Sequence, residues 1–293
     1  MAYSHVLLGA KTRTRPTVRQ IGFADIKDAL AKGLDDFLAM PTHALFLCAV
    51  YPVIGLILAR LAFGYSVLPL LYPLASGFAL VGPVAALGLY ELSRRREAGL
   101  AADAGNALDV LKSSSIGAII ALGLLLFAIF VLWVAVANAI YIDNFGYAPP
   151  ASIRGFVTEV LTTRPGWNLI VVGNGVGLLF AIAVLSISVV SFPLLLDRDV
   201  GAAVALATSI RVVAKNPVTM AAWGLIVAAL LLLGSLPAFL GLTVTVPVLA
   251  HATWHLYRRA VKADKTPPRS PLERHTEHRY AADFPAVLFP WAR

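Results

Sequence analysis

Histidines are the side chains in this sequence whose spacing could support cofactor chemistry. His251 and His255 are four residues apart, so both imidazoles lie on one face if this segment is helical. Imidazoles at that spacing can ligate a metal or face haem groups. With His43 they are weak candidates for cofactor binding, but no cysteine or carboxylate cluster and no CxxCH motif accompanies them. We therefore predict no metal site and no cofactor, and favour interfacial or packing roles near helix ends, where imidazoles reach water.

Motifs of the common enzyme classes are missing from the sequence. It contains no GxSxG, HExxH or GxxxxGK[ST] pattern, so no catalytic residue is predicted. The glycine-rich run 172–177 does not fit a dinucleotide fingerprint and lies within an apolar segment. Gly173 and Gly177 have the spacing that lets two helices approach closely, which is the preferred interpretation. The question of enzymatic activity stays open, and its absence is favoured.

Polar groups deep in the apolar segments are few. Asn138 and Asn174 are the most embedded polar side chains, and either could hydrogen-bond a neighbouring helix. Glu91 is followed by three arginines, so a local ion pair explains it. The lack of central charges argues against an ion-coupled pump, although a carrier of a neutral or apolar solute stays open.

The composition indicates a protein that resides in a membrane. Of 293 residues, 59% are apolar and 14% charged, whereas a soluble domain has roughly a quarter charged. This composition excludes a disordered chain, a collagen and a disulfide-rich secreted module. The single cysteine, Cys48, permits no internal disulfide. The net charge of +8 does not indicate nucleic-acid binding, because the basic residues have a topological explanation.

The apolar segments predict an all-α, polytopic membrane helix bundle. A bilayer core needs about 20 apolar residues as a helix, and the sequence predicts six such spans, at 43–63, 67–91, 116–141, 168–194, 218–236 and 238–257. The last two form one uncharged stretch, which Gly234, Pro237 and Gly241 break into a hairpin. Five spans are the main alternative.

The distribution of basic residues predicts the orientation of the chain. With six spans, 21 of the 24 Lys and Arg residues fall on one side, and only Arg60, Arg154 and Arg164 fall on the other. The positive-inside rule then places both termini in the cytoplasm of a bacterium, with the spans in its inner membrane. The first twenty residues are too basic and too poor in apolar residues to form a signal peptide.

Amphipathic segments precede three pairs of spans on the cytoplasmic side. In 25–40 the apolar stripe consists of Ile26, Leu30, Leu34 and Phe37. Most of the charged residues lie outside this stripe, and they are Asp25, Lys27, Asp28, Lys32 and Asp36. The segment 103–112 repeats the pattern with Ala104, Leu108 and Leu111, and 199–215 follows. These segments suggest three repeats of an interfacial helix plus a membrane hairpin, although interfacial helices commonly flank spans without any repeat.

We predict three regions along the chain. Residues 1–20 form a basic N-terminal tail, 21–262 the membrane domain, and 263–293 a polar, disordered C-terminal tail. The longest external loop, at about 142–167, has room for a short helix but not for a catalytic domain.

The sequence resembles a bacterial integral-membrane family, domain of unknown function 2189. The resemblance rests on Gly33 with Asp36-Phe37, on Pro41-Thr42-His43, on Gly77-Phe78 through Gly82-Pro83, on Gly88 to Glu91 with the arginines after it, and on the ending from His251 to Arg259. It covers about residues 20–262. It implies a multi-span protein of the cytoplasmic membrane, sometimes labelled a cytochrome c oxidase subunit. The sequence lacks the clustered histidines of a haem–copper core, and the family supplies no catalytic residues.

These observations favour a non-catalytic structural or accessory component of a membrane complex, with the lipid bilayer and other membrane subunits as its partners. A carrier of a neutral or apolar solute is the second hypothesis. A haem-binding or oxidase-associated protein that uses His43, His251 or His255 is the third.

Overall fold

The computed structural model describes residues 16–40, 68–70, 73–74, 82–84, 86–237 and 239–262. These residues are helical apart from connecting turns and one isolated bridge between Val18 and Val261, which confirms the all-α class. The helices are α2 (Phe23–Ala39), η1 (Leu68–Leu70), α6 (Leu87–Glu97), η2 (Ala104–Lys112), α7 (Ile116–Phe145), α8 (Ile153–Thr162), α9 (Arg164–Ser188), α10 (Ser191–Asp197), α11 (Ala202–Lys215), α12 (Pro217–Ser235) and α13 (Leu242–Ala260).

Among the residues that the structure describes, three segments are long and apolar enough to cross a membrane. They are α7, the stretch Arg164–Asp197 that combines α9 and α10, and α12. They confirm helices at the predicted spans 116–141, 168–194 and 218–236. Large apolar side chains are exposed along these helices, including Leu124, Leu179 and Leu225. A protein surface of this kind is stable in contact with lipid rather than water.

The other three predicted spans have different outcomes. The segment 43–63 lies outside the described residues. The segment 67–91 is described only in part, at 68–70, 73–74, 82–84 and 86–91, and its end forms the start of α6. The segment 238–257 forms α13 after the predicted break, but α13 is not among the candidate spans. Its second half, from His251, is polar and packs against other helices, so a full crossing over 238–257 is not shown.

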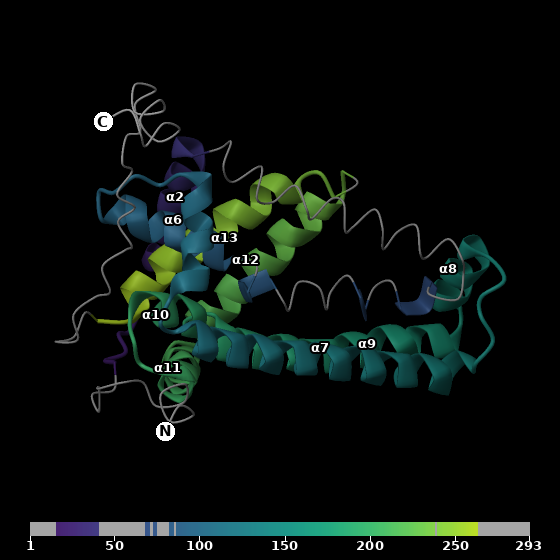
Figure 1. Cartoon of the computed structure of the whole chain (residues 1–293). Coiled ribbons are helices and arrows are strands. Elements are labelled where there is room, and N and C mark those ends of the chain that lie inside the picture. Colours follow the sequence, from purple (N-terminus) through teal and green to yellow (C-terminus); the bar gives the residue numbers. More distant parts are fainter. Residues whose placement is uncertain are drawn as a thin grey trace, which may run out of the picture.

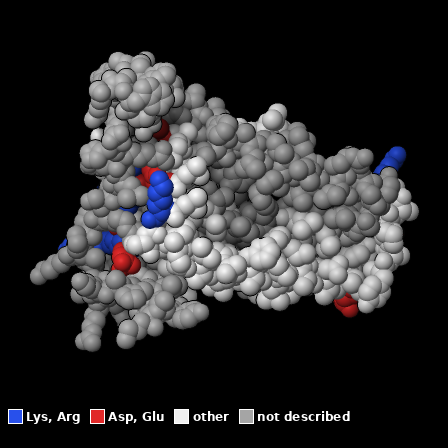
Figure 2. Space-filling view, in the orientation of Figure 1, with Lys and Arg blue, Asp and Glu red and all other residues white. Residues whose placement is uncertain are grey.

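The helices are arranged in two parts (Figure 1). α7 runs away from a group of helices formed by α2, α6, α10, α11 and the second half of α13, and α9 returns beside it. The short helix α8, which was expected in the external loop, covers the far end of this pair. Figure 2 shows charged side chains at both ends of the visible face, with an uncharged surface between them among the described residues. This charge pattern fits a molecule that spans a bilayer.

All three predicted amphipathic segments form helices, and in two of them residues outside the predicted apolar stripe are buried within the protein. In α2 the buried residues are Ile26, Ala29, Gly33, Asp36 and Phe37, while Leu34 is exposed. A Cβ on Gly33 would lie 2.6 Å from the backbone nitrogen of Ala252, so only a residue without a side chain allows α13 to approach this closely. A residue without a side chain, Gly33, and a charged one, Asp36, therefore face inward together with Ile26 and Phe37.

The second amphipathic segment is a 3₁₀ helix rather than an α-helix. Because a 3₁₀ helix has three residues per turn, residues three apart share a face. η2 accordingly buries the pairs Asn106 with Asp109 and Ala107 with Val110. Leu108 and Leu111 of the predicted apolar stripe are exposed.

A clasp of hydrogen bonds fixes the start of α2 to α12 and α13. The side chain of Asn216 accepts a hydrogen bond from the backbone N–H of Ile21 (2.9 Å) and donates one to the carbonyl of Arg19 (3.1 Å). The backbone N–H of Arg19 donates to the carbonyl of Ala260 (2.8 Å). The clasp aligns α2 along α13, and this alignment places Asp36 beside the two histidines.

Candidate functional site

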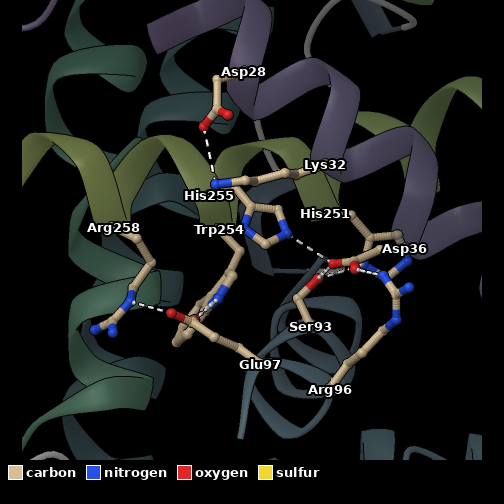
Figure 3. A network of polar contacts seen from close by, with 10 residues as sticks. All are labelled: Asp28, Lys32, Asp36, Ser93, Arg96, Glu97, His251, Trp254, His255 and Arg258. Atoms are coloured by element: carbon tan, nitrogen blue, oxygen red, sulfur yellow. Dashed lines mark hydrogen bonds and ion pairs between the residues drawn. The ribbon is translucent and has the colours of Figure 1, made fainter. Parts of the chain in front are cut away.

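Five polar side chains meet where α2, α6 and α13 pack together (Figure 3). Asp36 comes from α2, Ser93 and Arg96 from α6, and His251 and His255 from α13. We call these five residues the central polar cluster. Asp36, Ser93 and His251 are buried, so their polar atoms depend on one another rather than on water.

Asp36 lies at the centre of the cluster. Its Oδ2 accepts hydrogen bonds from Ser93 Oγ (2.6 Å) and His255 Nε2 (2.9 Å), and its Oδ1 accepts one from Arg96. Ser93 Oγ in turn lies 2.7 Å from His251 Nδ1. One carboxylate therefore links α2 to both α6 and α13.

The arrangement of donors determines where the protons lie. Ser93 has one hydroxyl proton, and an ionised Asp36 can only accept, so Ser93 donates to Asp36. The bond between Ser93 and His251 then requires the Nδ1–H of His251 as its donor. In neutral His251 the proton is on Nδ1, and Nε2 makes no hydrogen bond of ordinary geometry within the described part of the chain.

Two groups of the cluster have shifted pKa values. Burial raises the pKa of Asp36, but the hydrogen bonds from His255, Ser93 and Arg96 outweigh burial and hold the pKa below its usual value. Burial lowers the pKa of His251 to about 4, with His255 and Arg96 adding to the effect and Asp36 opposing it. The stable state at neutral pH is thus an ionised Asp36 beside a neutral His251.

The three consecutive arginines of α6 each pair with a different carboxylate. Arg94 pairs with Glu91 (2.8 Å), which is the local ion pair predicted from the sequence. Arg95 lies 3.8 Å from Asp109 of η2, and Arg96 reaches Asp36 of α2. The arginine run therefore connects α6 to two other elements, and the sequence-based interpretation holds for its first member alone.

A second set of contacts ties α13 to the ends of α6 and α10. Trp254 Nε1 donates to Glu97 (2.9 Å), and Arg258 Nε donates to the same carboxylate (3.1 Å). The Tyr257 hydroxyl donates to Asp197 (2.6 Å). These bonds fix the polar half of α13 to the ends of α6 and α10, next to the central polar cluster.

The residue types of the cluster are those of a hydrolase triad, but their order is different. In a Ser-His-Asp triad the histidine lies between the other two and removes the serine proton. Here Ser93 lies between Asp36 and His251, donates its proton to the carboxylate, and is buried. Such a serine is not an activated nucleophile.

No group of three or more His, Cys, Asp or Glu side chains suited to a metal occurs in the part of the chain that the structure describes.

The structure brings two of the three predicted histidines together. His251 and His255 both face Asp36, whereas His43 lies outside the described residues. The expectation that these histidines reach water is wrong for His251, which is 0% exposed, because α2 packs over this part of α13. The side chain of His255 is 14% exposed.

Sequence reasoning missed Asp36, Ser93 and Arg96 as site residues. Asp36 was taken as part of the polar face of an interfacial helix, and Arg96 as part of a local ion pair. A signal was present in the family resemblance, which includes Gly33 and Asp36 on α2 and the ending that contains both histidines. Ser93 carried no signal of its own.

The two embedded asparagines are in different surroundings. Asn174 lines a cavity of about 270 Å³ at the α8 end of the α7–α9 pair, together with Trp133, Tyr141 and Phe156. Asn138 is not among the residues that line it. Asn174 Nδ2 donates to the carbonyl of Ile170 (2.7 Å), which provides a partner for the amide within α9.

The predicted glycine packing is correct for one of the two glycines. A Cβ on Gly177 would lie 3.1 Å from the Trp133 ring of α7, so the helices do approach closely there. A Cβ on Gly173 would have no neighbour within 4 Å, because this glycine borders the cavity.

Comparison with known proteins gives one match. Searches of curated proteins and of solved structures give none for this chain. Residues 70–197 match the model of the family described as "Predicted integral membrane protein (DUF2189)". The match includes Ser93 and the arginine run of α6, together with α7, α9 and α10. Over residues 70–197, the chain is therefore similar to the integral membrane protein family DUF2189.

Proposed function

We propose that this protein is a non-catalytic structural or accessory component of a membrane complex, in which the central polar cluster fastens α2 to the membrane bundle. The observation that carries the proposal is the position of Asp36, which accepts hydrogen bonds from side chains of both α6 and α13. A carboxylate used in this way joins three helices that are far apart in sequence.

The chemistry of the cluster supports a structural role rather than a catalytic one. The Ser93 proton and the facing nitrogen atoms of both histidines are engaged in bonds within the cluster. Hydrogen bonds to a buried charge are stronger than those between neutral groups. Removing one side chain of the cluster leaves its hydrogen-bond partners unpaired, because water does not reach them to take its place.

The proposed topology keeps both termini in the cytoplasm of a bacterium, with residues 21–262 as the membrane domain. α12 and the apolar half of α13, Leu242 to Ala250, form a hairpin that returns to its side of origin. The sixth predicted segment then ends before His251, and the central polar cluster lies at the cytoplasmic face. The three amphipathic segments α2, η2 and α11 each precede a hairpin of this topology, as a repeated unit requires.

The accessory role is supported by the outer surface of the spans. α7, α9 and α12 expose rows of large apolar side chains that fit either lipid or another membrane subunit. Cross-linking in intact membranes tests this part of the proposal. We expect a discrete, reproducible heavier species, and a protein that remains a single chain at every cross-linker concentration would contradict an accessory role.

The hydrogen bonds by which Asp36 joins α2 to α6 and α13, which we call the clamp, are tested by neutralising Asp36. We expect Asp36→Asn to lower the free energy of unfolding in mild detergent by about 2 kcal/mol, because hydrogen bonds from Arg96 and His255 to a charge are lost. Asp35→Asn is the matched control, since Asp35 is the preceding residue on α2 and is exposed. Equal stability of the two variants would overturn the clamp.

The cavity beside α8 favours a second candidate function, the transport of a neutral or apolar solute. Its lining is apolar and aromatic apart from the Asn174 amide and the Tyr141 hydroxyl. Flux of apolar solutes into proteoliposomes tests this candidate, with Gly173→Leu as the variant that fills the cavity.

The central polar cluster gives no support to haem binding, because Ser93 and Asp36 occupy the histidine nitrogen atoms that face them.

A further inference from the structure

The buried imidazole of His251 lies beneath α2. Gly33 of α2 contacts Ala252, the residue that follows His251, and Asp36 lies one helical turn further along. Water can therefore hydrate His251 only if α2 moves away from α13. The solvation of one titratable side chain is linked to the position of a whole helix.

The charged groups that face His251 come from all three helices. They are Asp36 on α2, Arg96 on α6 and His255 on α13. Asp36 favours a charge on His251, while Arg96 and His255 oppose it. A hydrogen bond with the backbone of Leu89 also favours a proton on His251, but burial of the imidazole opposes the charge more strongly than any of these contacts favours it.

We propose that α2 is a latch released by cytoplasmic acid, which is closed while His251 is neutral and opens as this imidazole takes up a proton. The inference rests on the clamp proposed above and adds a ligand to it, the proton. The moving part is α2, and the groups that hold it are Asp36 and Gly33. Residues 17–19, just before α2, pair with residues 260–262 at the end of α13, so release of α2 also alters this pairing.

The direction of the pH effect follows from linkage. In the closed state the pKa of His251 is about 4, and in the open, hydrated state it returns to about 6.5. The open state therefore binds more protons between these two values, and opening becomes more favourable as the pH falls through this window. From pH 7.5 to 5.5 the open population rises about tenfold.

Other groups of the cluster do not produce the same response. Asp36 stays ionised throughout this window, because its pKa is held below the usual value. His255 donates a hydrogen bond to Asp36 and so helps to hold the latch closed. The acid response is therefore assigned to His251, the fully buried imidazole.

Hydrogen–deuterium exchange of the full-length protein in lipid nanodiscs tests the latch. Amide exchange of α2 is measured at several pH values between 7.5 and 5.5, corrected for the intrinsic rate, and compared with exchange of α7. We expect the protection of α2 to fall about tenfold at pH 5.5, while that of α7 is unchanged. An α2 that stays equally protected at both pH values would overturn the latch without affecting the clamp.

Two histidine variants identify the sensor. His251→Gln keeps an amide that can donate to Ser93 but cannot titrate, so the pH dependence should disappear. His255→Gln is the matched control and must keep the loss of protection at pH 5.5. If His251→Gln does not fold, His255→Gln alone decides, because a response lost in that variant would assign the sensor to His255. Failure of the clamp gives a different result from failure of the latch, since α2 would then exchange freely even at pH 7.5.

Discussion

At the scale of single residues, the buried interior of these helices is mostly apolar, but it also contains several charged side chains. Asp36, Asp109 and Asp197 are all buried, and each contacts an arginine or a histidine. A buried carboxylate is tolerated only with such partners, because desolvation of an unpaired charge is costly. The paired charges therefore define which helices touch.

The ion pair between Arg95 and Asp109 allows this point to be tested. Both side chains are almost fully buried, so Arg95→Met removes the buried cation of this carboxylate, leaves it only the exposed Lys112, and should cost about 3 kcal/mol of unfolding free energy. The double variant Arg95→Met/Asp109→Leu should recover at least half of that loss. Lys112→Met is the control, because Lys112 contacts the same carboxylate from the exposed side and should cost under about 1 kcal/mol. A double variant no better than Arg95→Met would argue against the pair.

Residue-scale prediction from the sequence succeeded where one helix alone decides the outcome. The pair of Arg94 with Glu91 lies within α6 and was predicted from spacing. The burial of Asp36 depends on where α13 packs, which the pattern of α2 alone does not reveal. Hydropathy assigns an aspartate to the water-facing side, and here the partner histidines are more than 200 positions later in the chain.

At the scale of elements, the most accurate predictions concern the long apolar helices. α7 and α12 were predicted close to their observed bounds, because length and hydropathy suffice to define a span. The break after α12 was also predicted from its glycines and proline. The second half of α13 was assigned to a span because its polar residues were taken as helix-end residues rather than as a contact surface for α2.

The contact between α2 and α13 depends on Gly33. Because a Cβ at this position would overlap the backbone of Ala252, we expect Gly33→Ala to separate the two helices and to cost about 2 kcal/mol of unfolding free energy. Gly175→Ala in α9 is the control, since a Cβ there meets no atom within 4 Å. Thermal unfolding in the same detergent compares them. Indistinguishable midpoints would contradict the close packing.

At the scale of the whole molecule, two charged ends enclose an uncharged middle (Figure 2). One end carries the central polar cluster and η2, and the other carries α8. Length and hydropathy predict the uncharged middle from the sequence alone, whereas the orientation inferred from the basic residues stays a prediction. The central claim is that the two ends lie on opposite sides of a bilayer, with the cluster on the cytoplasmic side.

Labelling of single cysteines in intact cells by a membrane-impermeant maleimide tests this claim most directly. Cys48 is first replaced by serine, and a cysteine is then placed at Lys112, which is 67% exposed at the cluster end, or at Tyr147, which is 87% exposed beside α8. The proposed topology predicts that Tyr147→Cys is labelled from outside, and that Lys112→Cys is labelled only after the cells are permeabilised. Labelling of Lys112→Cys in intact cells, or protection of Tyr147→Cys, would contradict it.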